Sequence, residues 1–170
     1  GAMLFIGSME GEVPGGNEFG GEFLYTTAKE LCEEFSTCVD ITGGDGDVPS
    51  ATSNEMIMTG LKNAVGSITA GSCDVVKGIL DDQILPALTV PLIQGTVKYA
   101  SFNALLGIGT EDASLSIGDA FAGAVLPLID QALPASAQTV QTQMQFQLTT
   151  QPVPAGFPAL ADALHAALTL

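Results

Sequence analysis

The spacing of aliphatic side chains between residues 52 and 80 constrains the fold more than any other feature of this chain. Over these residues, apolar side chains recur every three or four positions for about seven turns: Ile57, Leu61, Ala64, Val65, Ile68, Val75, Val76 and Ile79. That period matches the turn of an α-helix and places the side chains on one face. Thr52 and Glu55 have the T-x-x-E spacing of a capping box. The sequence therefore predicts a long helix that packs through this face.

Four glycines interrupt the same segment, at positions 60, 66, 71 and 78. Each is less favourable than alanine inside a helix, by about 1 kcal/mol. Their recurrence predicts a close approach of a second helix along this face. A break in the helix near Gly71 is the alternative.

Four further segments have helical patterns. We expect helices over 21–37, over 82–106, over the apolar face that runs from Ile117 to Leu133, and over 158–169. Pro86, Pro91 and Pro127 are expected to kink or divide these helices. Thr110 is the expected N-cap of the third. The segment 82–106 is long enough to cross a bilayer, but its polar residues favour a buried core helix.

One segment has a different period. Between residues 139 and 149, apolar residues alternate with four glutamines, which is typical of a half-buried strand. Its expected partner is a short strand at Leu4–Ile6 or another subunit, and a helix remains the alternative. Residues 39–51 contain three glycines and a proline, which predicts a loop.

Together these patterns predict a mainly α fold, a compact bundle of about five or six kinked amphipathic helices with one or two short β-strands. The first residues, Gly1-Ala2-Met3, are typical of what remains after a tag is cleaved. We expect residues 1–20 to comprise this remnant and an irregular arm, and residues 21–170 to form a single helical domain.

The charge balance excludes one large class of function. The chain has 19 acidic residues against four lysines and no arginine, and its net charge is −15. Nucleic-acid binding depends on cations that displace counterions from phosphate, so a nucleic-acid partner is excluded. The acidic side chains are expected to form a solvated surface. Attraction of cations such as Ca²⁺ is the alternative.

The acidic loop is the candidate metal site. Asp40, Asp45, Asp47 and Glu55 are hard oxygen ligands of the kind that Ca²⁺ prefers. The EF-hand pattern requires glycine at the sixth position and glutamate at the twelfth. Counted from Asp45, these positions are Ser50 and Met56, so the pattern does not fit. An Asp/Gly turn whose side chains cap the backbone is the alternative.

The three cysteines, Cys32, Cys38 and Cys73, lack the spacing of a zinc site. On one straight helix, Cys32 and Cys38 would point to different sides, so we do not expect them to pair. Cys73 can bridge to either of them. Alternatively, all three are small buried apolar residues.

Catalytic motifs are absent from the sequence. No nucleophile elbow, P-loop or dinucleotide-binding fingerprint occurs, and the one histidine, His165, is expected on a helix surface or at an interface. The sequence therefore leans away from an enzyme.

The leading hypothesis is a non-enzymatic binding module, secreted or surface-associated, that holds an apolar, lipid-like ligand between its helices. The expected lining residues are Ile68, Val76, Leu88, Phe102, Phe121 and Val125. A self-assembling structural subunit is the first alternative, and a carboxylate- or Ca²⁺-dependent enzyme or Ca²⁺-binding domain is the second. No cofactor other than Ca²⁺, and no stable membrane span, is expected.

Overall fold

The computed structural model describes residue 5 and residues 24–41, 48–105, 112–144 and 153–168. Over these residues the protein is mainly helical with one two-stranded antiparallel sheet, which confirms the predicted fold class. The chain divides into two compact units, Gly1–Pro91 and Leu92–Leu170.

The first helix whose bounds the structure describes in unit 1 is α2, Leu24–Glu34. It buries Ala28, Leu31 and Cys32, which are three and four positions apart and so form one helical face. The helix ends earlier than predicted, because the chain enters the left-handed region at Ser36, with φ 54°. The Thr37 amide then donates to the Cys32 carbonyl at 2.8 Å and completes the reversal.

A β-hairpin follows α2 where the sequence predicts a loop. Strand β1, Cys38–Ile41, pairs antiparallel with β2, Val48–Ala51, and Cys38 lies opposite Ala51. The loop prediction is wrong for seven residues, 39–41 and 48–51, because four-residue strands are too short to show a period. Pro49 is tolerated in β2 because each strand of a two-stranded sheet pairs along one edge and has its other edge free.

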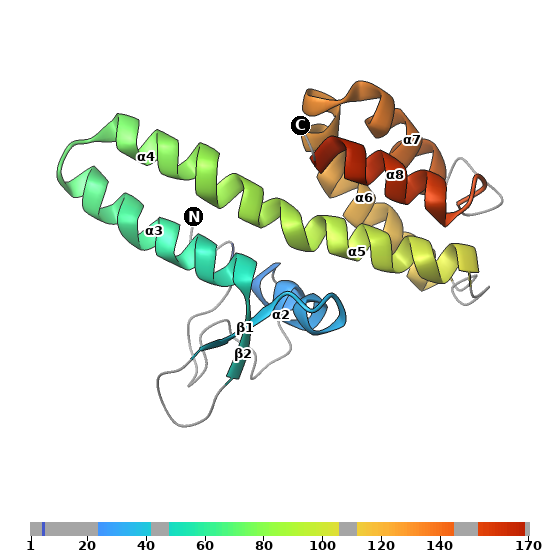
Figure 1. Ribbon diagram of the computed structural model, residues 1–170. Helices are drawn as coiled ribbons and strands as arrows, with labels where there is room; N and C mark the ends of the chain where they lie inside the picture. Colours follow the sequence, from blue (N-terminus) through green and yellow to red (C-terminus); the bar gives the residue numbers. More distant parts are fainter. Residues whose placement is uncertain (1–4, 6–23, 42–47, 106–111, 145–152, 169–170) are drawn as a thin grey trace. The chain divides into compact units, whose positions relative to one another are not determined.

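The long apolar segment forms a helical hairpin and not one helix. Helix α3, Thr52–Thr69, is followed by α4, Cys73–Ile79, and by a π-helical turn η2, Leu80–Ile84. The reversal occurs at Gly71, whose φ of 73° favours glycine. Figure 1 shows α3 and α4 side by side. The alternative of a break at Gly71 is therefore the correct one.

Close packing explains only one of the four glycines. A Cβ atom at Gly60 would lie 2.8 Å from Cγ1 of Ile84, so α3 and η2 approach closely there. Gly66 has nothing within 4 Å, and Gly78 only the Asp82 carboxylate at 4.0 Å. The buried cluster of this unit contains Phe5, Ile57, Ile84 and Ala87.

The predicted capping box does not form. The residue that precedes α3, Ala51, has no side chain able to cap it, and Thr52 Oγ1 donates to the Thr37 carbonyl at 2.7 Å. Glu55 instead accepts a hydrogen bond from Ser50 Oγ at 3.0 Å. Both side chains of the motif thus bond to other residues, Thr52 to Thr37 just before β1 and Glu55 to Ser50 in β2. The local sequence pattern cannot reveal these partners.

Helix α5, Leu85–Leu105, begins in unit 1 and continues in unit 2, where α6, Asp112–Ala132, α7, Pro134–Met144, and α8, Phe157–Leu168, follow. Pro91 and Pro127 lie inside helices and do not divide them. Thr110 lies outside the described residues. The core of unit 2 contains Ala100, Ala122, Val125, Ile129, Val140 and Leu160 among its buried side chains.

The predicted strand at 139–149 is wrong for the residues that the structure describes, because α7 continues to Met144. Val140, Gln143 and Met144 are buried, and their spacing is that of a helix face. Alternation and helical spacing coincide over such a short run. The strand expected at Leu4–Ile6 as its partner is described only at Phe5, which is helical and buried. Leu4 and Ile6 lie outside the described residues.

None of the helices, as far as they are described, combines the length and the apolar character needed to cross a bilayer.

The contact between α5 and α6 can be tested through two glycines of unit 2. A Cβ atom at Gly95 would overlap the Phe121 ring, whereas nothing lies within 4 Å of that position at Gly123. We expect Gly95→Ala to lower the free energy of unfolding by about 1–3 kcal/mol through overpacking. Gly123→Ala is expected to raise it by about 0.4–1 kcal/mol, because alanine is the better helix former. Urea denaturation measures both, and equal stabilisation by the two variants would contradict this packing.

Candidate functional site

The candidate Ca²⁺ ligands are only partly placed by the structure. Asp45 and Asp47 lie outside the described residues, and Asp40 belongs to strand β1. Glu55 lies in the first turn of α3 and accepts the hydrogen bond from Ser50. In the part of the chain that is described, no three acidic, cysteine or histidine side chains gather in a way that could hold a metal ion. The Ca²⁺ site stays a prediction.

Three of the six predicted ligand-lining residues belong to unit 1. Ile68 lies in the last turn of α3 and is 62% exposed. Val76 in α4 is half-buried. Leu88 packs against the buried cluster that contains Ile57 and Ile84. Ile68 therefore faces solvent, whereas Leu88 contributes to a packed core.

The other three belong to unit 2, where two of them share a neighbour. The rings of Phe121 and Tyr99 stack with their centroids 5.8 Å apart, and Phe102 meets Tyr99 edge-on at 6.0 Å. All three rings are half-buried. Val125 is fully buried in the core of unit 2. The structure thus brings Phe102 and Phe121 together around Tyr99.

The end of the α3–α4 hairpin exposes large apolar side chains. Val65, Ile68 and Val75 are 65%, 62% and 54% exposed, and all three lie within about two turns of Gly71. Val65 and Ile68 share a face of α3, because they are three positions apart. We call these three residues the hairpin end. The sequence pattern assigned them to the buried face of one long helix, and Gly71 was the signal that could have separated them.

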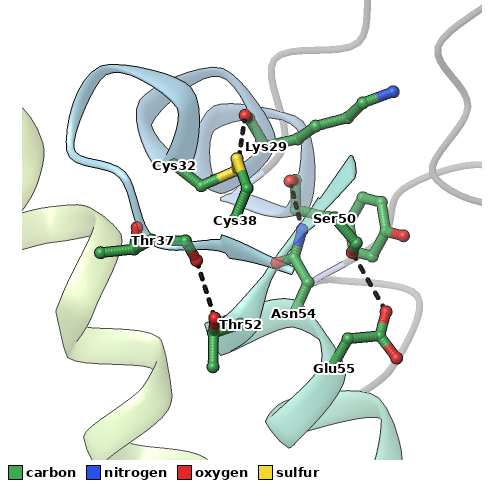
Figure 2. The surroundings of a disulfide bond; sticks show 9 residues. Lys29, Cys32, Thr37, Cys38, Ser50, Thr52, Asn54 and Glu55 are labelled. Carbon is green, nitrogen blue, oxygen red and sulfur yellow. Dashed lines mark hydrogen bonds between the residues drawn. A yellow bond between two sulfur atoms is a disulfide. The ribbon is translucent and has the colours of Figure 1, made fainter. Parts of the chain in front are cut away.

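The opposite end of unit 1 holds a disulfide between Cys32 and Cys38, whose Cα atoms are 4.8 Å apart (Figure 2). The prediction that these cysteines do not pair is wrong, because the reversal at Ser36 brings the start of β1 back to the last turn of α2. Cys73 is free and exposed at the start of α4, so neither its bridging nor its burial is found.

A set of polar side chains surrounds this disulfide (Figure 2). Asn54 is fully buried, and its Nδ2 donates to the Tyr25 carbonyl at 2.8 Å, while its Oδ1 has no hydrogen-bond partner. Burial raises the pKa of the Tyr25 hydroxyl above its usual value. A hydrogen bond with Ser50 lowers this pKa, and the negative charge of Glu55 raises it. These bonds join α2, β2 and the first turn of α3.

The remaining candidates for chemistry lie on helix surfaces. His165 is exposed on α8, in agreement with its prediction as a helix-surface residue. Lys77 and Asp81 form an exposed ion pair one turn apart.

Comparisons with protein-family models, with curated proteins and with solved structures find no match to this chain. The hairpin end holds the three most exposed large apolar side chains of the described residues, so it is the surface feature that most requires a functional explanation.

The raised pKa of Tyr25 makes the stability of the protein depend on alkaline pH. The folded state holds the phenolic proton more tightly than the unfolded state does. The stabilisation of the folded state that results is complete below about pH 10 and is lost as the pH rises through the folded-state pKa. We expect the free energy of unfolding to fall less steeply in Tyr25→Phe than in the unmodified protein between about pH 9 and pH 12. Urea denaturation at a series of pH values measures this, and identical slopes would contradict it.

Proposed function

We propose that this protein is a non-enzymatic self-assembling subunit and that two copies meet through the hairpin end. The observation that supports this is the exposure of Val65, Ile68 and Val75, each more than half accessible to solvent. Single exposed aliphatic residues are common on protein surfaces and need no explanation. Three exposed β-branched residues flank one turn, and exposed apolar side chains that gather in this way are typical of contact surfaces.

The charge distribution permits a second copy as the partner at this place. With a net charge of −15, two copies repel each other over most of their surfaces. Residues 63–73 contain no charged side chain, so the α3 side of the hairpin end can meet its counterpart without opposing charges. Complete burial of a valine or isoleucine stabilises by about 1.5–3 kcal/mol. Because association has its own entropic cost, a reversible, concentration-dependent complex is the expected result.

The disulfide supports a location outside the cytosol. Stable disulfides are characteristic of secreted and cell-surface proteins, because cytosolic reductants keep thiols reduced. Cys32 and Cys38 are paired in this structure. An extracellular or other non-cytosolic setting is therefore part of the proposal.

Self-association can be tested with charge substitutions at matched apolar sites. Ile68→Asp and Ile117→Asp each add one negative charge at an exposed isoleucine, in α3 and in α6 respectively. We expect Ile68→Asp to abolish concentration-dependent association in sedimentation velocity and Ile117→Asp to retain it. Added salt is expected to strengthen the association of the unmodified protein, since it screens the repulsion between like charges.

Two results would contradict this proposal. One is a monomer at every protein and salt concentration. The other is association that Ile68→Asp leaves unchanged, which would place the contact elsewhere.

An apolar-ligand carrier is the second candidate, supported by the half-buried aromatic group of Tyr99, Phe102 and Phe121 in unit 2. Apolar ligands bind among such side chains. We expect a fatty acid to raise the melting temperature of a delipidated sample in differential scanning fluorimetry. The shift is expected to shrink in Phe121→Ala. No shift for the unmodified protein would rule this candidate out.

A further inference from the structure

We infer that the Cys32–Cys38 disulfide is a redox latch, whose reduction releases the β1–β2 hairpin from α2 while α3, α4 and η2 stay folded. This inference is independent of self-association and concerns the opposite end of unit 1.

The surroundings of Cys32 suit both redox states. Its Sγ atom lies 3.2 Å from the Lys29 carbonyl oxygen (Figure 2). A disulfide sulfur has no hydrogen, so this contact is not a hydrogen bond in the oxidised protein. After reduction the two sulfur atoms move apart to non-bonded contact, and the Cys32 thiol can then donate to that oxygen. Because Cys32 is completely buried beside Ala28 and Ala51, this ready acceptor avoids an unsatisfied buried thiol.

The two cysteines differ in burial, which sets the expected order of the reaction. Cys38 is half-buried at the start of β1, whereas Cys32 is fully buried. A thiolate of a small dithiol attacks Cys38 Sγ, the disulfide breaks, and Cys32 leaves as a thiolate that takes up a proton. The second thiol of the reagent then attacks the reagent sulfur that is bonded to Cys38 in the mixed disulfide. This releases Cys38 as a thiolate, which is protonated, and leaves the reagent as a cyclic disulfide.

Besides this bond, the hairpin is held to α2 by a hydrogen bond between Ser50 and Tyr25 and by a small buried cluster. The buried cluster there consists of Ala28, Cys32 and Ala51, with Cys38 packed against it. These small side chains bury little apolar area, and a two-stranded hairpin is only marginally stable by itself. The separate cluster around Ile57, Ile84 and Ala87 holds α3 and η2 and includes no cysteine.

Two hydrogen bonds limit how far the released hairpin affects α3. The Thr37 carbonyl accepts from the Thr52 amide at 3.1 Å and from Thr52 Oγ1 at 2.7 Å. These bonds do not involve sulfur, so reduction leaves them intact at the start of α3. The structural change is thereby confined to β1, β2 and their contact with α2.

Hydrogen exchange measured by mass spectrometry tests the latch on the full chain. A Cys73→Ser background removes the exposed free thiol, so that a dithiol acts on the disulfide alone. We expect reduction to accelerate exchange of the strand amides in β1 and β2 by tenfold or more, as loss of a short disulfide-closed loop implies. Amides in the second half of α3 are expected to exchange at the same rate in both states.

The variant Cys38→Ser separates a latch from a general structural disulfide. It retains the Cys32 thiol beside the Lys29 carbonyl, so its exchange pattern is expected to match that of the reduced protein. Reoxidation of the reduced Cys73→Ser protein is expected to restore slow exchange in β1 and β2. Equal acceleration throughout α3 and α4, unchanged exchange in β1 and β2, or an unfolded Cys38→Ser protein would each overturn the inference.

Discussion

The reversal at Gly71 is the constraint on which the architecture of unit 1 depends. A left-handed φ of 73° allows the chain to turn back between α3 and α4, and η2 then extends toward the start of α3. The return places Ile84 against Gly60, where a side chain larger than hydrogen would collide. The same turn leaves Val65 and Ile68 beyond the packed part of the hairpin. One backbone conformation therefore creates both the core contact and the exposed apolar end.

Two parts of unit 1 are stabilised by different physical means. Around Ile57 and Ile84, burial of branched aliphatic side chains supplies the free energy. Around Cys32, the side chains are too small for this, and a covalent bond together with hydrogen bonds from Asn54 and Thr52 takes its place. This difference explains why a change of redox state is expected to act on one part alone.

Sequence periodicity predicted elements well where an apolar face was long and failed where elements were short or depended on distant partners. Helix α8 and the greater part of α2, α5 and α6 agree with their predictions. The alternation at 139–149 was misread because Val140 and Met144 satisfy both a strand and a helix period. The capping box at Thr52 failed because the Thr37 carbonyl, fifteen positions earlier, is its hydrogen-bond partner. The pairing of Cys32 with Cys38 was missed because it requires the turn at Ser36.

The sequence by itself determined the helical character of this protein and the strongly acidic charge, since both follow from the kinds of side chain and their spacing along the chain. Tertiary structure alone decided which apolar residues are buried. Ile57 and Ile68 have the same place in the pattern, yet one is in the core and the other faces water. The physical reason is that burial depends on whether another element covers a side chain. That is decided by where the chain turns, and a periodic pattern of apolar residues does not contain this information.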